Sequence, residues 1–165
     1  MKRKIIIIGM DNTGKTTLVR DLRDLLRVES ITSPGPNFTK EEMYNNIENN
    51  LLKDDLVIIE RFSPIEEIIY GKILRGYSKF SFKELYTINK KYHPVFIYCR
   101  PKKEDIFNFG ERDQMEGVIE KSRKLLKGFD NLYIKMLQND FDIIRYDFRT
   151  STPKEMVLKY ERIAK

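Results

Sequence analysis

Hydrophobic residues along the chain gather in five short runs, and between these runs they recur at the spacing of amphipathic helices. Three of the runs are continuously hydrophobic, which is typical of strands buried on both faces of a parallel sheet. The alternation of strands and helices predicts an α/β fold, a three-layer sandwich around a five-stranded parallel sheet. The predicted strands are Lys4–Ile8, Val28–Ile31, Leu56–Ile59, Val95–Cys99 and Asp142–Arg145.

Four predicted helices begin with Ser or Thr followed by Glu three positions later, the spacing of a capping box. These caps are Thr39, Ser63, Ser81 and Thr152. Ser63 and Thr152 each precede a proline, which suits the first position of a helix. The longest helix is predicted from about Met115 to Gln138, with Gly128 as a weak point inside it.

The length of 165 residues fits one domain, residues 1–165, with a core of its own. The net charge of +6 favours an anionic ligand but does not separate a nucleotide from a polynucleotide. Cys99 is the single cysteine, and no apolar run approaches membrane-spanning length. We therefore expect a soluble, cytoplasmic protein with no membrane partner.

The first hydrophobic run leads into Gly9-Met-Asp-Asn-Thr-Gly14-Lys15-Thr16, which fits the phosphate-loop pattern G-x-x-x-x-G-K-[ST] between a strand and a helix. The glycines let backbone N–H groups point at phosphate oxygens, near the positive end of the following helix. Lys15, expected to be a solvent-facing ligand group, can reach the β- and γ-phosphates, and Thr16 can coordinate Mg²⁺. The predicted cofactors are therefore ATP and Mg²⁺. The residues predicted to hold the nucleotide here are Gly9, Asn12, Thr13, Gly14, Lys15, Thr16 and Thr17.

The third hydrophobic run ends in Glu60-Arg61, unlike the corresponding segments of GTPases and motor ATPases. A carboxylate and an arginine at the carboxyl end of a central strand lie beside the phosphate loop. Glu60 can hold Mg²⁺ through water or accept a proton from an attacking oxygen, and Arg61 can neutralise a phosphate. The pair suits phosphoryl transfer, and a salt bridge at the strand end is the plainer alternative.

Two segments resemble thymidylate kinases: "GMDNTGKTTL" is similar to their phosphate loop, and "VIIERF" is similar to their Asp-Arg-Tyr/Phe segment. The next segment, "SPIEEIIYG", is similar to small phage-type deoxynucleoside monophosphate kinases. The resemblance implies the P-loop kinase fold with strand order 2-3-1-4-5. It places Asp11 near the acceptor sugar and Arg61 on the acceptor phosphate. It also implies that the protein can form a homodimer and can be virus-encoded, acting in the host cytoplasm.

The sequence departs from this family at two places. Glu60 replaces an aspartate and resembles the Glu-Arg-Ser segment of deoxynucleoside kinases, which leaves the acceptor open between a monophosphate and a 5′-hydroxyl. Thr32-Ser33-Pro34-Gly35 stands where thymidylate kinases commonly have Arg-Glu-Pro-Gly, so the family's arginine is missing. Arg75 can substitute for it, and a surface role for Arg75 is an equal alternative.

The segment from about residue 100 to 116 corresponds to the family's lid and is rich in cations. Cations delivered by a closing segment can stabilise the charge of a transferring phosphoryl group. Arg112 is the leading catalytic cation of this lid, and Arg100 is the second candidate, predicted to contact substrate. A solvated charged face is the plainer alternative for both.

Aromatic side chains near these motifs are candidates for stacking on a base. Phe62 and Tyr70 follow the Glu60-Arg61 pair, and Tyr133 resembles a tyrosine that thymidylate kinases place near the acceptor. Core packing is the alternative for each of them. Arg149, after the fifth run, fits the loop that packs against the adenine of the donor.

The predicted function is ATP-dependent phosphoryl transfer to a deoxynucleoside monophosphate resembling dTMP, which gives the diphosphate. The predicted partner is a small-molecule nucleotide, and we do not expect nucleic acid. A deoxynucleoside kinase or polynucleotide 5′-kinase is the alternative within enzymes. A nucleotide-binding regulatory protein or a nucleic-acid ATPase, for which the charge of +6 would be relevant, is the alternative from another class.

Overall fold

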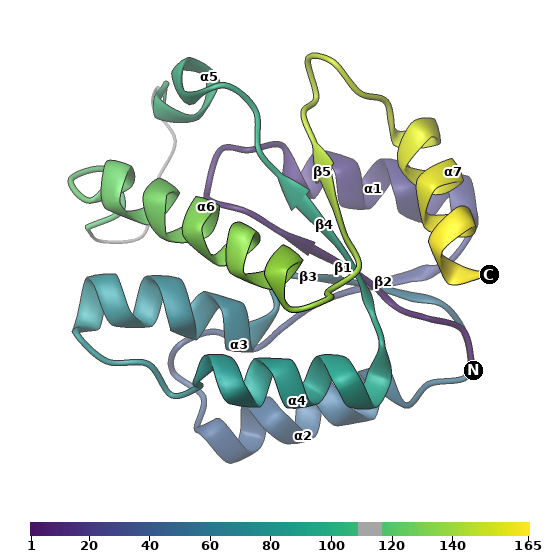
Figure 1. Ribbon diagram of the computed structural model, residues 1–165, viewed down its shortest axis with the longest axis horizontal. Coiled ribbons are helices and arrows are strands. Elements are labelled where there is room, and N and C mark those ends of the chain that lie inside the picture. The colour runs from purple at the N-terminus through teal and green to yellow at the C-terminus, as the bar shows by residue number, and fades with distance from the viewer. Residues whose placement is uncertain (109–116) are drawn as a thin grey trace.

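A five-stranded parallel sheet forms the middle layer of the protein (Figure 1). The structure is a computed structural model that describes residues 1–108 and 117–165. Its strand order is β2-β3-β1-β4-β5, which confirms the predicted order and fold class. The strands are β1 (Ile5–Ile8), β2 (Glu29–Thr32), β3 (Val57–Glu60), β4 (Val95–Cys99) and β5 (Ile143–Tyr146).

Helices cover both faces of the sheet (Figure 1). Two of them, α1 (Lys15–Leu26) and α7 (Pro153–Ala164), pack on one face. The opposite face is covered by α2 (Lys40–Leu51), α3 (Ser63–Glu66), the π-helix η1 (Glu67–Arg75), α4 (Phe82–Tyr92) and α6 (Ser122–Gln138). A short helix, α5 (Lys103–Phe107), follows β4. Among the described helices, none has the length and apolar character needed to cross a membrane.

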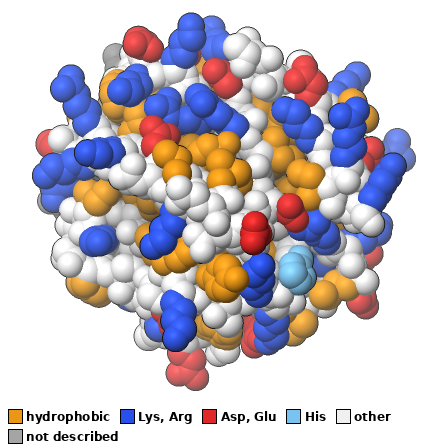
Figure 2. Space-filling model, viewed as in Figure 1, with side chains coloured by type: hydrophobic (Ala, Val, Ile, Leu, Met, Phe, Trp, Pro, Cys, Tyr) orange, Lys and Arg blue, Asp and Glu red, His pale blue; other side chains and the backbone are white. Residues whose placement is uncertain are grey.

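Charged side chains of both signs are spread over the surface. Figure 2 shows Lys and Arg side chains interspersed with acidic and hydrophobic ones on the viewed face, rather than in one continuous band. The basic side chains on this face are therefore dispersed rather than gathered in one patch.

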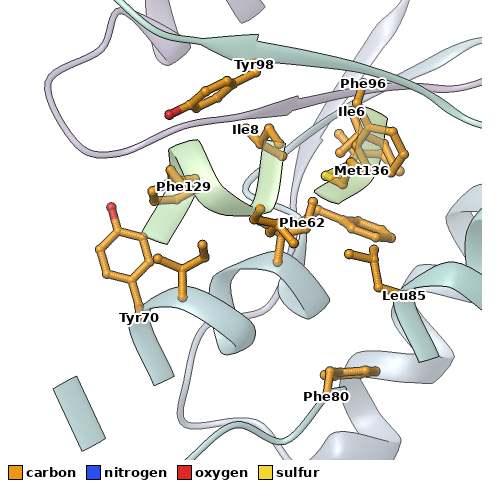
Figure 3. Close-up of a cluster of buried hydrophobic side chains, with 14 of the residues drawn as sticks. Ile6, Ile8, Phe62, Tyr70, Phe80, Leu85, Phe96, Tyr98, Phe129 and Met136 are labelled. Atoms are coloured by element: carbon orange, nitrogen blue, oxygen red, sulfur yellow. The ribbon is translucent and has the colours of Figure 1, made fainter. Parts of the chain in front are cut away.

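Strand β1 explains why the sheet is buried on both sides. Its four isoleucines are at most 2% exposed, and they divide between two cores. Ile6 and Ile8 pack in the cluster beneath α3, α4 and α6, which also holds Phe62, Phe96 and Phe129 (Figure 3). The other two, Ile5 and Ile7, pack against α1 and α7. A continuous hydrophobic run is what a central strand between two helical layers needs.

Three of the four predicted helix caps are present. Thr39 and Ser81 form complete capping boxes, and the Thr152 hydroxyl accepts a hydrogen bond from the backbone of Glu155. The prediction for Ser63 was wrong, because Phe62 is the capping residue and Ser63 is the first helical residue. The Ser63 hydroxyl instead donates to the carbonyl of Pro34, at 2.9 Å, and so ties α3 to the loop after β2.

The start of the longest helix was also predicted wrongly. Helix α6 begins at Ser122, and residues 117–121 form turns, while residues 109–116 lie outside the described part of the chain. Gly128 lies inside α6 as expected, and a Cβ there would meet Ile69 and Ile73 of η1 at 3.3 Å. The glycine therefore lets α6 and η1 approach each other closely.

Candidate active site

The phosphate loop joins β1 to the first turn of α1, and two of its glycines have backbone angles that disfavour other residues. Gly9 has a φ of +147°, and a Cβ there would lie 2.7 Å from the carbonyl oxygen of Cys99. Gly14 precedes α1 with a φ of +83°. Together they turn the loop so that it runs into the positive end of a 12-residue helix, which favours bound anions.

Lys15 is buried within the loop rather than solvent-facing, which corrects the expectation from the sequence. It is 4% exposed, and its ammonium donates to the carbonyl of Met10. Burial lowers the pKa of Lys15, while the nearby carboxylate of Glu66 acts in the opposite direction. Thr13 donates to the same carbonyl at 2.7 Å, so both side chains brace the loop from inside. Lys15 is thus held at the base of the loop, within reach of phosphates that enter it.

Thr16 and Glu60 come together across the gap between α1 and the end of β3. The Thr16 hydroxyl donates to Glu60 Oε1 at 2.9 Å, and Glu60 pairs with Ile7 and Thr32 in the sheet register. A hydroxyl and a carboxylate are hard oxygen donors, of the kind that hold Mg²⁺ together with phosphate oxygens and water. The two residues therefore fit a bound Mg²⁺, which would neutralise charge on the phosphates. Thr17, the next residue, is exposed on α1.

Asp11, Arg61 and Tyr70 form a second cluster on the other side of the loop. Arg61 has a φ of +57°, and its guanidinium pairs with Asp11 Oδ1 at 3.2 Å. The Tyr70 hydroxyl accepts a hydrogen bond from the backbone N–H of Asp11 at 3.1 Å. Burial would lower the pKa of Arg61, but the carboxylates of Glu66 and Asp11 outweigh it and raise that pKa. The arginine is therefore a fixed cation beside the phosphate loop.

A cavity of about 520 Å³ opens beside this cluster. One wall is the loop after β2, and another is the helical segment from Ser63 to Arg75. Glu66 lines it with a buried Oε1 atom that has no hydrogen-bond partner among the described residues. Burial raises the pKa of Glu66 to about 7, although Lys15 and Arg61 act to lower it. The polar and charged residues that line it include Ser33, Arg61, Glu66, Glu67, Arg75 and Lys121.

Three predicted substrate contacts are placed away from this cavity. Phe62 is fully buried and packs edge-to-face on Phe96, so it has no free face for a base. Tyr133 packs against Tyr98 in the core, with ring centroids 5.2 Å apart. Arg100 is held by the carboxylate of Asp130 at 2.8 Å and 3.0 Å. Their side chains are thus taken up by structural contacts, whereas Tyr70 lines the cavity. Arg112 lies outside the described residues.

The far end of the phosphate loop faces α5 and the loop after β5. Asn12 donates to backbone carbonyls of α5 and its flank, including that of Ile106 at 2.9 Å. Arg149 pairs with Asp105 at 2.9 Å and lies over the ring of Phe148. Phe148 is 39% exposed, and a Cβ on Gly14 would lie 3.2 Å from its ring. This corner offers an aromatic face and a guanidinium next to the phosphate loop.

Interpretation of the sequence missed Glu66, Glu67 and Phe148. Both glutamates lie in the segment "SPIEEIIYG", and Glu66 is also the expected partner of a helix cap at Ser63, but neither is predicted from the sequence as a site residue. Two consecutive glutamates directly after a Glu-Arg pair were the available signal, because four acidic or basic groups in eight residues seldom all face solvent. Phe148 gave no signal, since a lone aromatic after a strand is more often part of the core.

The strand order, with helices on both faces of the sheet and the phosphate loop after β1, matches the fold of P-loop kinases. Solved structures with this fold align along nearly the whole chain. YorR protein from Bacillus subtilis, solved with phosphorylated GDP, has a TM-score of 0.76 at 18% identity over 97% of this chain and 94% of its own. Deoxyadenosine kinase from M. mycoides, with dCMP and dCDP bound, has a TM-score of 0.64 at 18% identity over 98% and 100%.

Thymidylate kinase from Candida albicans has a TM-score of 0.60 at 16% identity, over 98% of this chain and 90% of its own. No family model and no curated protein matches the sequence. The likeness to known proteins is therefore one of fold.

Proposed function

We propose that this protein is a kinase that transfers the γ-phosphoryl group of ATP·Mg²⁺ to a deoxynucleoside 5′-monophosphate. The observation that carries the proposal is the position of Arg61, between the phosphate loop and a cavity large enough for a nucleotide. The cavity volume of about 520 Å³ lies within the usual range for small-molecule sites, about 300–1,000 Å³. The structural neighbours named above support kinase chemistry by analogy of fold.

The charge of the cavity supports an anionic acceptor. Arg61 and Lys121 line it, and the loop glycines and α1 provide a separate site for the donor phosphates. An acceptor phosphate held by Arg61 would face the donor's γ-phosphate across the loop. Two phosphates that approach each other require neutralising cations on both sides.

Each residue around the loop has a distinct task in this mechanism. Lys15 and the backbone N–H groups hold the donor phosphates, while Thr16 and Glu60 hold Mg²⁺. Arg61 orients the acceptor oxygen, and Asp11 holds Arg61 in place. Positioning and charge neutralisation supply most of the rate enhancement in such reactions.

A second candidate function is phosphorylation of the 5′-hydroxyl of a deoxynucleoside, and Glu66 is the observation that favours it. A hydroxyl acceptor has to lose its proton, and a base with a pKa near the working pH is suited to take it. Glu60 Oε1 accepts a hydrogen bond from the hydroxyl of Thr16, whereas Glu66 is a cavity-lining residue whose Oε1 has no partner among the described residues. Glu66 is therefore the base in this alternative.

The two candidates differ in acceptor and in the effect of Glu66→Gln. The experiment measures ADP formation from ATP·Mg²⁺ with each deoxynucleoside and each monophosphate, in the wild type, in Glu66→Gln and in Glu161→Gln. Glu161 is an exposed glutamate on α7 and serves as the matched control. A monophosphate kinase turns over monophosphates only, and Glu66→Gln keeps its kcat within about tenfold. Turnover of deoxynucleosides, with a loss of 100-fold or more in Glu66→Gln but not in Glu161→Gln, establishes the alternative.

A further inference from the structure

Three buried polar atoms have no hydrogen-bond partner in the described part of the chain: Ser33 Oγ, Glu66 Oε1 and Arg75 Nε. All three residues line the cavity beside the phosphate loop. Buried polar groups in folded proteins are nearly always paired, because an unpaired group has lost its hydration without compensation. Because all three atoms belong to residues that line one cavity, this cavity is a candidate site for a ligand that hydrogen-bonds.

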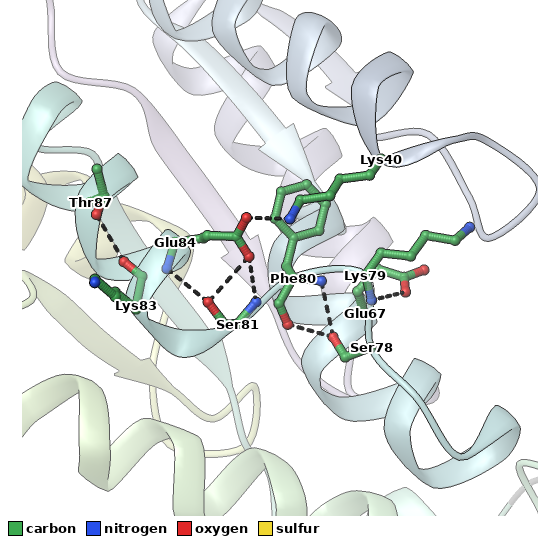
Figure 4. Close-up of polar contacts among 9 residues, drawn as sticks. All are labelled: Lys40, Glu67, Ser78, Lys79, Phe80, Ser81, Lys83, Glu84 and Thr87. Carbon is green, nitrogen blue, oxygen red and sulfur yellow. Dashed lines mark hydrogen bonds and ion pairs between the residues drawn. The ribbon is translucent and has the colours of Figure 1, made fainter.

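Arg75 belongs to an ion pair that is built into the helix η1. Its guanidinium Nη2 donates to Glu67, whose side chain is only 4% exposed. The same carboxylate oxygen accepts the backbone N–H of Lys79 at 3.1 Å (Figure 4). Glu67 is therefore held from two sides, and it holds Arg75 in turn.

Gly71 makes room for this pair. It lies between Glu67 and Arg75 at a spacing of four residues, so the three residues share the cavity face of η1. A Cβ at Gly71 would lie 2.6 Å from Arg75 Nη2 and 3.0 Å from Glu67 Oε2. On its other side the guanidinium lies over the ring of Tyr77, 5.0 Å from the centroid. These contacts fix the guanidinium, while Nε has no hydrogen-bond partner among the described residues.

We propose that the Glu67–Arg75 pair reads the base of the acceptor, with Arg75 Nε–H donating to a carbonyl oxygen or ring nitrogen on the base edge. This inference rests on the proposed function, because it assumes that the cavity binds a nucleoside or nucleotide acceptor. Arg75 is a specificity-determining residue in this account, and Glu67 is the residue that positions it.

A base suits this end of the cavity better than a phosphate does. Glu67 neutralises Arg75, and Glu66 lines the same cavity, so an added phosphate would approach two carboxylates. A neutral base edge avoids that repulsion and offers a hydrogen-bond acceptor for Nε–H. Its own N–H groups can donate to Glu66 Oε1, because bases carry donors and acceptors side by side. Arg75 is therefore assigned to the base rather than to the acceptor phosphate.

Arg75→Lys tests the proposal directly, because lysine keeps the positive charge beside Glu67 but lacks the Nε–H donor. We measure kcat and KM for the four deoxynucleoside monophosphates, and binding of each in the absence of ATP by calorimetry. The expected result is a rise of about tenfold or more in KM and Kd for the preferred acceptor, a weaker preference among bases and an unchanged KM for ATP. The matched control is Arg162→Met on the exposed face of α7.

A second variant keeps the proposal testable if Arg75→Lys does not fold. Glu67→Met with Arg75→Met replaces the whole pair by apolar side chains, which avoids leaving one buried charge unpaired. It should fold, as judged by circular dichroism, and show the same loss of base preference. Wild-type acceptor KM and base preference in both variants would overturn the assignment. If the wild type neither binds nor phosphorylates any nucleoside or monophosphate, the proposed function itself has failed.

Discussion

Replacement of Lys15 should lower the catalytic activity without lowering the stability of the fold. Its ammonium is buried and bound to a single carbonyl, so the charge is desolvated in the free protein. We expect Lys15→Met to lower kcat/KM by about 1,000-fold or more, because the transition state loses the ammonium group that would stabilise the negative charge of the phosphates. The melting temperature should stay the same or rise, since methionine avoids the cost of burying the ammonium.

Steady-state kinetics and thermal unfolding of the same preparation check this prediction. Lys159→Met, at an exposed position of α7, is the control for loss of one lysine. Full activity in Lys15→Met would mean that the phosphate loop does not hold the donor.

Glu66 links the cavity to the pH dependence of stability. Its pKa is raised to about 7 by burial, from an ordinary value of 4.5, so the folded protein binds this proton more tightly than the unfolded chain. The stabilisation is present below pH 4.5 and is lost as the pH rises through 7. At pH 8 Glu66→Gln should therefore be more stable than the wild type by about 1–3 kcal/mol, and near pH 4 the difference should vanish. Urea unfolding at both pH values measures it, and an equal difference at both would exclude a raised pKa.

For the residues that carry motifs, the sequence predicted their position beside the phosphate loop. Asp11, Arg61, Thr16 and Glu60 meet around the phosphate loop because they end or follow neighbouring parallel strands. Phe62 did not behave as predicted, because hydrophobicity alone does not tell whether an aromatic ring faces a cavity or the core. Its ring is covered on the core side of α3, against Phe96.

Packing of α6 against η1 depends on a glycine that helix propensity alone would disfavour. A Cβ at Gly128 would press on Ile69 and Ile73 at 3.3 Å. Valine has a better helix propensity than glycine, yet Gly128→Val should destabilise the protein by about 1–3 kcal/mol through overpacking. Because η1 carries Glu67 and Arg75, the acceptor KM should rise as well.

Chemical denaturation of Gly128→Val, compared with Lys127→Val at the exposed neighbouring position, tests this packing. The control should change stability by no more than about 0.5 kcal/mol, as expected for propensity alone. A Gly128→Val protein that is more stable than the wild type would show that α6 and η1 are not in close contact.

The elements that the sequence predicted well are those with a strong local signal. The continuous runs of β1, β3 and β4 and the capping boxes at Thr39 and Ser81 lie within a residue or two of their predicted places. The π-helix η1 was not predicted, because its wider turn differs from an α-helix by one residue of hydrogen-bond spacing and leaves a similar hydrophobic pattern. The early start predicted for α6 arose because Val118 is buried like a helix residue but lies in a turn.

We expect a small anionic substrate rather than a polynucleotide, and the charge on the face seen in Figure 2 supports this expectation. The net charge is +6, and on the viewed face the basic side chains are interspersed with acidic and hydrophobic ones. Polynucleotide binding uses clustered cations and weakens steeply with salt. We expect kinase activity to change less than about threefold between 50 and 200 mM salt, and duplex or single-stranded DNA to leave the rate of ATP turnover unchanged. If DNA strongly stimulates ATP turnover and high salt abolishes this stimulation, the alternative function of a nucleic-acid ATPase is favoured.

The proposed reaction is the transfer of a phosphoryl group from ATP to a deoxynucleoside monophosphate. The most direct test incubates the protein with γ-³²P-labelled ATP, Mg²⁺ and each monophosphate, and separates the labelled products by chromatography. We expect label in a deoxynucleoside diphosphate, and this label should depend on Mg²⁺ and be absent with Lys15→Met. Label that appears only as inorganic phosphate, whichever acceptor is present, would contradict it.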